Sequence, residues 1–203
     1  PLELDGTNGT IVNVDVGNTD WLKEVLFGGK PWLIYCDDKK SARREPMPPV
    51  FRESAIQLSG MATFGAIDCW ERTASGKTLA HRFDFRTTPV VFAVANGDPP
   101  LVVDLAGVTK PWQLRRKVQS HLRPNVTRID SPHTFKALCT SRRACLMVGF
   151  KTANMLADTL TVLQPVLEDH RGVRAVAVDT SVWKVKLDDK LAATKPKRKD
   201  GQK

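Results

Sequence analysis

The sequence contains no apolar run close to the ~20 residues needed to span a bilayer, and its start, Pro-Leu-Glu-Leu-Asp, is not a signal peptide. It also has no glycine-rich phosphate loop, no His-Glu-x-x-His pattern and no serine elbow. Its four cysteines are too few for a disulfide-built scaffold and lack the spacing of zinc ligands. We therefore expect no membrane span, no cofactor and no metal ion.

What the sequence does have is length and positive charge. With 203 residues and 41% hydrophobic content, it can form one large domain or two small ones. The segment 190–203 has six basic residues against Asp200, so it carries +5 of the net charge of +9. Such a lysine-rich end is typical of a solvated extension. The alternative is a contact with an acidic protein or RNA, made by Lys195, Lys197, Arg198 and Lys199.

A proline opens one of the strands that we expect in the first half of the chain. The stretch Arg86-Thr87-Thr88-Pro89 leads into Val90 to Val94, whose β-branched residues are typical of a buried strand. Proline cannot donate to a ladder and is found at strand starts, edges and bulges. The Thr88–Pro89 bond is therefore either an ordinary trans bond at a strand start or a cis bond beside a functional surface.

Strands and helices follow one another around this proline in a recognisable order. We expect a buried strand at 32–36, a helix with prolines near its start that reaches Leu58, a second buried strand at 62–69, a further strand at 101–105 and a helix at 111–122. This order resembles a thioredoxin-like domain over roughly residues 14–123. The resemblance implies an α/β fold, a thioredoxin-like sandwich with a central mixed sheet in a domain of residues 1–123, and a cis bond before Pro89.

The cysteine pair of redox-active thioredoxin-like domains is absent. In those members a Cys-x-x-Cys pair begins the helix after the first buried strand, where helix N–H groups stabilise a thiolate. Counting back from Pro49, the matching positions are Ser41-Ala42-Arg43-Arg44. Because exchange through a mixed disulfide needs a second thiol, we predict that it is lost at this site. We interpret Cys36, which has no partner nearby in sequence, as a small buried hydrophobe, the alternative being a single-cysteine reactive site.

The resemblance also implies a peptide-binding surface that needs no thiol. In the family, main-chain groups beside the cis-proline pair with an extended peptide, which is strand addition. Thr88 and Pro89 match that position, and we expect Arg43 and Arg44 at its rim. The predicted occupant is an extended segment of another protein or the second half of this chain. The five tryptophans, Trp70 among them, fall mostly within apolar patterns.

The second half of the chain partly repeats the first. Two prolines and several turn formers predict a linker at 124–132. Beyond it, the patterns predict a strand at 143–150, a helix at 152–170 in which Pro165 causes a kink or an early end, and a strand at 173–179. This order suggests a partial second thioredoxin-like βαβ unit at 133–189, followed by the basic tail at 190–203. Residues 183–187 alternate like a further strand, and we expect this truncated unit to lean on the first domain.

Cys139 and Cys145 are the remaining redox candidates. Arginines between them could lower a thiol pKa, but five intervening residues do not make the tight helix-end motif. The alternatives are two reduced thiols or a structural disulfide. The arrangement is similar to tandem thioredoxin-like regions downstream of a J domain in some endomembrane J-proteins. The His-Pro-Asp tripeptide that J domains need is absent, so no such activity is assigned.

Three functional hypotheses remain at this stage. The leading one is a redox-inactive thioredoxin-like module that binds proteins as a scaffold or as the client-binding part of a co-chaperone. The second is a basic structural subunit of a large assembly, such as an organellar ribonucleoprotein, anchored by its tail. The third is a disulfide oxidoreductase using Cys139 and Cys145. The sequence does not decide between an endomembrane lumen and an organelle matrix.

Overall fold

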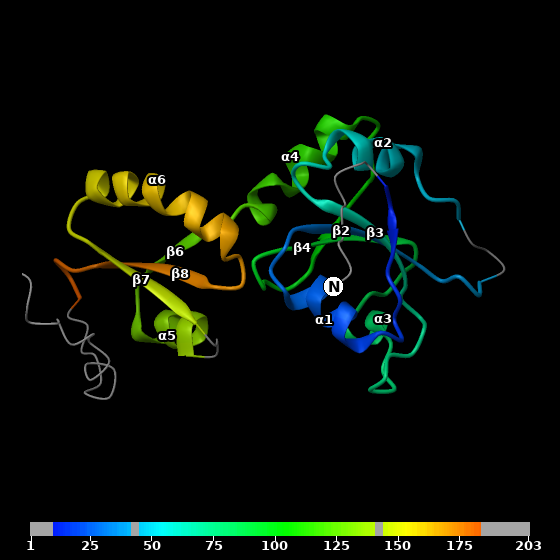
Figure 1. The fold of residues 1–203 in the computed structure, drawn as a ribbon, viewed down its shortest axis with the longest axis horizontal. Helices are drawn as coiled ribbons and strands as arrows, with labels where there is room; N and C mark the ends of the chain where they lie inside the picture. The colour runs from blue at the N-terminus through cyan, green and yellow to red at the C-terminus, as the bar shows by residue number, and fades with distance from the viewer. Residues whose placement is uncertain (1–9, 42–44, 141–143, 184–203) are drawn as a thin grey trace, which may run out of the picture.

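The computed structural model describes residues 10–41, 45–140 and 144–183 of the chain. They form two lobes, each built on its own β-sheet, which lie side by side in Figure 1. Within these described ranges, no helix is long and apolar enough to cross a membrane.

The first lobe is built on a five-stranded mixed sheet in the order β1-β3-β2-β4-β5. Strands β1, β3 and β2 are parallel to one another, whereas β4 is antiparallel to β2 and β5 is antiparallel to β4. The strands are β1 (Val12–Asn13), β2 (Trp32–Asp37), β3 (Thr63–Asp68), β4 (Val90–Val94) and β5 (Leu101–Val103). The predicted α/β fold with a central mixed sheet is thereby confirmed.

Four helices belong to this lobe, and their ends follow from local sequence. They are α1 (Thr19–Phe27), α2 (Pro49–Gln57), α3 (Leu79–Arg82) and α4 (Pro111–Leu122). Helix α1 begins where the Asn18 side chain accepts from the Trp21 amide at 3.1 Å. Helices α2 and α4 both begin with proline, whose fixed φ suits the first helical turn and whose missing N–H costs nothing there.

The first sheet is buried on both faces, because consecutive residues of β2 point to opposite sides and all six are buried. Leu33 and Tyr35 pack with residues of α2 and α4, where Phe51 meets Phe64 at a ring separation of 5.1 Å. Trp32, Ile34 and Cys36 pack on the opposite face with residues of α1 and α3. Figure 1 shows the corresponding three layers, with α2 and α4 above the sheet and α1 and α3 below it.

The second lobe has a three-stranded parallel sheet in the order β6-β8-β7. Its elements are β6 (Val126–Ile129), α5 (Pro132–Phe135), the π-helical turn η2 (Lys136–Thr140), β7 (Cys145–Phe150), α6 (Ala153–Asp169) and β8 (Arg174–Asp179). Helix α6 covers one face of this sheet and α5 lies on the other (Figure 1). The order of β6, β8 and β7 repeats that of β1, β3 and β2, which agrees with the predicted second βαβ unit.

One expectation for this lobe needs correction. Residues 126–129, which we placed in a linker, form strand β6 and pair with β8. The helix predicted at 152–170 is confirmed as α6, which continues past Pro165 to Asp169, so of the two alternatives for Pro165 the early end is excluded. Leu167 is the one buried residue of α6, so the helix covers its sheet only loosely. The division of the chain into two domains and a tail stays a prediction.

Polar contacts join the two lobes. Arg171, after α6, donates from Nη1 to the carbonyl oxygen of Leu122 at the end of α4, at 2.7 Å. Arg174 at the start of β8 forms an ion pair with Asp98, which precedes β5. The second lobe therefore rests on the first through arginines, and the exposed side of α6 stays uncovered within the described chain.

Candidate peptide-binding groove

The Thr88–Pro89 peptide bond is cis, as the resemblance implies, and it lies directly before β4. The ladder between β2 and β4 begins at the pair Cys36 and Val90, so the residues before Val90 lie outside the sheet. Within the described residues, the main-chain groups of Thr87 and Thr88 make no hydrogen bond. Thr87 is exposed and Thr88 is half-buried. An extended chain therefore finds free donors and acceptors here.

A pocket of about 390 Å³ opens beside this segment. Thr87 and Pro89 line one side, Val102 and neighbouring residues of β5 line another, and Glu45 and Pro48 line the side towards α2. The Tyr35 hydroxyl donates to the Glu45 carbonyl oxygen at 3.1 Å, which fixes the segment before α2 to the sheet. The pocket thus unites the segment before α2 with the Pro89 turn and the edge of the sheet.

Several predicted site residues lie outside the described residues. Arg43 and Arg44 belong to the segment 42–44, and the tail residues Lys195, Lys197, Arg198 and Lys199 belong to 184–203. Their roles stay predictions. Thr88 and Pro89 are described, and Glu45 lies directly after the segment that carries the two arginines.

Trp70 does not line the pocket but contacts Thr88, and sequence reasoning missed this contact. Its indole Nε1 donates to the Thr88 hydroxyl at 3.4 Å, and 46% of its surface is exposed. The Asp68 carboxylate positions it, since Oδ1 accepts from the main-chain amides of Trp70 at 3.0 Å and Glu71 at 3.1 Å. The sequence feature that could have indicated Trp70 is its position just after a buried parallel strand, because the ends of such strands meet at one edge of the sheet.

The interpretation of Cys36 as an unpaired hydrophobe is wrong, because Cys36 forms a disulfide with Cys69. The last residues of β2 and β3 are neighbours in register, with Asp37 opposite Asp68, and this brings two cysteines 33 positions apart together. Neither cysteine is exposed at all. This disulfide therefore lies in the core behind the groove and presents no sulfur to a bound chain.

Cys139 and Cys145 also form a disulfide, in the second lobe. Cys139 is buried at the end of η2, whereas Cys145 is half-buried at the start of β7. The structure thus brings the two redox candidates together and places them in a different lobe from Thr88 and Pro89. Among the residues that the structure describes, no group of three or more potential ligands could hold a metal ion.

No protein-family model matches the sequence, and no curated protein matches it either. Solved structures do resemble the chain. The J-Trx1 fragment of ERdj5 is 17% identical, covers 56% of this chain and 50% of its own, and has a TM-score of 0.43. Human ERp44 in its zinc-bound form is 16% identical, covers 83% of this chain and 48% of its own, and has a TM-score of 0.43.

A thioredoxin of Malassezia sympodialis is 21% identical, covers 55% of this chain and 90% of its own, and has a TM-score of 0.40. The chain thus spans half the length of the ERdj5 fragment and slightly less than half of the human ERp44 chain. These structural neighbours are thioredoxin-like proteins.

Proposed function

We propose that the first lobe is a protein-binding module that holds an extended segment of a partner protein along Thr87, Thr88 and Pro89. The observation that carries this proposal is the free main chain of Thr87 and Thr88 beside a pocket of about 390 Å³. A bound strand would hydrogen-bond to that main chain and place a side chain in the pocket, which is how strand addition combines affinity with specificity.

Exposed apolar surface near Thr88 and Pro89 supports the proposed binding of an extended segment. Val102 on the edge strand β5 lines the pocket and is 53% exposed, and Trp70, whose indole donates to Thr88, is 46% exposed. Large aromatic side chains with a polar tip are common anchors in protein interfaces. A strand bound along Thr87 and Thr88 would add apolar contact with Val102, which lines the pocket, to its main-chain hydrogen bonds.

The proposed binding does not involve thiol exchange in this groove. All four cysteines are in disulfides, and the pair nearest to the groove, Cys36–Cys69, is fully buried. A partner would thus be held by main-chain pairing and apolar contact alone. Such a module suits a scaffold or the client-binding part of a co-chaperone, and the resemblance of the sequence to regions of J-proteins favours the second use.

A peptide selection tests the proposal. Extended peptides would be selected from a random library on the parent protein, and their affinity would be measured by fluorescence anisotropy. Val102→Glu should weaken binding by about tenfold or more, because a charge replaces apolar contact in the groove. Val162→Glu is the matched control, since Val162 is 74% exposed on α6. Failure to select any peptide, or equal affinities for both variants, would contradict the proposal.

The disulfide of the second lobe, in which Cys145 is only half-buried, favours a second candidate function, disulfide transfer to a client dithiol. A client thiolate would attack Sγ of Cys145, and Cys139 would leave as a thiol. The client's second thiol would then displace Cys145, so that the client gains a disulfide and the protein gains two thiols. An insulin-reduction assay run with excess dithiol tests the reverse reaction. Turnover by the parent that is lost in Cys145→Ser supports this function, and undiminished turnover or none in the parent removes it.

A further inference from the structure

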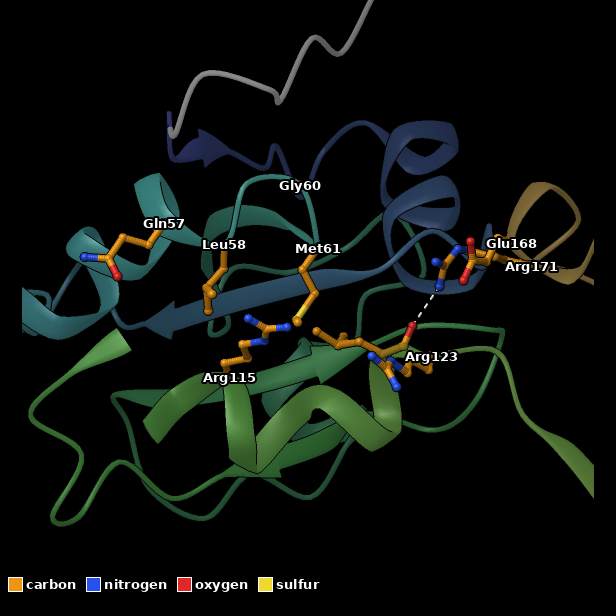
Figure 2. Close-up of a pocket in the computed structure, with 9 residues that line it drawn as sticks. Gln57, Leu58, Gly60, Met61, Arg115, Arg123, Glu168 and Arg171 are labelled. Carbon is orange, nitrogen blue, oxygen red and sulfur yellow. Dashed lines mark hydrogen bonds between the residues drawn. The ribbon is translucent and has the colours of Figure 1, made fainter. Parts of the chain in front are cut away.

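A second pocket lies at the other end of α2, where the two lobes meet. Its volume is about 400 Å³. Figure 2 shows Gln57 and Met61 on the side of α2, Arg115 and Arg123 on the side of α4, and Glu168 with Arg171 arriving from the second lobe. Side chains of both lobes therefore line this pocket.

The pocket carries an excess of positive charge. Three arginines and one glutamate line it, which leaves a net charge of +2 if all are ionised. In the part of the chain that is described, the side chains of Arg115 and Arg123 have no hydrogen-bond or ion-pair partner. Two guanidinium groups are therefore available to a ligand.

Arg171 is held in place from the protein side. It donates to the Leu122 carbonyl oxygen at 2.7 Å, which is the dashed line in Figure 2. Partial burial lowers the pKa of its guanidinium and Glu168 opposes that change, but an arginine stays protonated in either case. Arg171 thus contributes a positively charged side chain, held by this hydrogen bond, to the pocket lining that also contains the two unpaired arginines.

We propose that this pocket binds a phosphate group carrying two negative charges. A planar guanidinium presents paired N–H donors that match two phosphate oxygens, and arginines from different elements can approach a tetrahedral group from several sides. The net charge of the pocket equals and opposes that of a phosphate dianion. Its volume lies in the range of small-ligand sites, roughly 300–1,000 Å³. The inference goes beyond the proposed peptide groove, which lies at the other end of α2.

The test uses the full chain and isothermal titration calorimetry at low ionic strength. Inorganic phosphate represents a free phosphate ligand, and a phosphoserine peptide represents a modified side chain. The matched peptides carry serine or glutamate at the same position, and sodium chloride is added to equalise ionic strength. Saturable binding of either phosphate probe supports the proposal, and the two arms show which source is preferred. No binding of either probe, or equal binding of the glutamate peptide, would overturn it.

Charge reversals locate the site. Arg115→Glu and Arg123→Glu should each weaken binding by about tenfold or more, because each replaces a positively charged hydrogen-bond donor with a carboxylate that repels the phosphate. Arg116→Glu is the control, since Arg116 is an exposed residue of α4 that does not line the pocket. It should change the affinity by less than about twofold. Equal losses in Arg115→Glu and Arg116→Glu would mean that the phosphate responds only to overall charge, and would overturn the proposed site.

Discussion

The main chain of Gly29 in the first lobe packs closely against the main chain of Arg171 in the second lobe. Gly29 has a φ of +89°, and a Cβ built on it would lie 2.7 Å from the carbonyl carbon of Arg171 and 2.7 Å from the nitrogen of Gly172. Real Cβ atoms essentially never approach backbone that closely, so any side chain at position 29 would push the lobes apart.

Replacing Gly29 with alanine should therefore destabilise the protein by about 2–4 kcal/mol, because a left-handed conformation and a steric clash add together. Gly76→Ala is the control, since Gly76 has a φ of +77° and open space around its Cβ. That variant should lose only about 1–2 kcal/mol. Urea unfolding measures the free energy of unfolding of both variants. Equal decreases would show that the lobes do not press together at Gly29.

The Arg171 side chain stabilises the end of α4, and its removal should be measurable. Arg171→Met keeps much of the side-chain length but removes a cation and a donor from a helix C-terminus. We expect the free energy of unfolding to fall by about 1 kcal/mol, since the group is only partly buried. Arg116→Met, on the exposed side of α4, should leave the urea midpoint unchanged. A urea midpoint for Arg171→Met equal to that of the parent would show that this hydrogen bond does not stabilise the protein.

The two disulfides should differ in their resistance to reduction. Cys36 and Cys69 are fully buried, whereas Cys145 is half-buried. With increasing dithiothreitol, mass spectrometry of alkylated protein should show Cys139 and Cys145 modified first. Cys69→Ala should lower the free energy of unfolding by roughly 3–4 kcal/mol, because the bond closes a long loop. Earlier alkylation of Cys36 and Cys69 would contradict the buried position of that bond.

Acid should weaken the second lobe through Asp179. Its carboxylate accepts from the Ser181 side chain and main chain and pairs with Arg128, so its pKa lies below the ordinary value of 3.8 in the folded protein. A lowered pKa contributes stability above the unfolded value, and this contribution is lost as the pH falls through the folded value. The urea midpoint should therefore decrease below about pH 4.

Asp179→Asn removes this titration while keeping an acceptor for Ser181, so the decrease of the urea midpoint on acidification should become shallower. Asp158→Asn is the control, because Asp158 is exposed on α6 and its side chain makes no hydrogen bond or ion pair within the described chain. The pH profile of that variant should match the parent. Identical profiles for Asp179→Asn and the parent would refute the assignment.

The first lobe was largely predictable because its elements are marked locally. Unbroken apolar runs indicate β2 and β3, prolines mark the starts of α2 and α4, and the Thr88–Pro89 dipeptide marks the turn into β4. Strand β6 was missed because only four residues form it and they lie close to two prolines and a turn. Its pairing with β8 depends on residues about 50 positions away, which no local pattern reveals.

The site was predictable only in part. Thr88 and Pro89 follow from the resemblance, whereas the Cys36–Cys69 bond depends on the register of two neighbouring strands. Trp70 was assigned with the apolar patterns, although its amide donates to Asp68 and its indole donates to Thr88. The arginine pocket forms from three separate elements of two lobes, so no spacing in the sequence indicates it.

Hydrogen–deuterium exchange at single-residue resolution tests the central claim most directly. The amides of Thr87 and Thr88 are unpaired within the described chain and should exchange fast in the free protein. A saturating selected peptide should slow exchange at one or both of these amides by about tenfold or more, as expected for a new main-chain hydrogen bond. Amides of α6 should be unaffected. Unchanged exchange at Thr87 and Thr88 with the peptide fully bound would contradict strand addition at this groove.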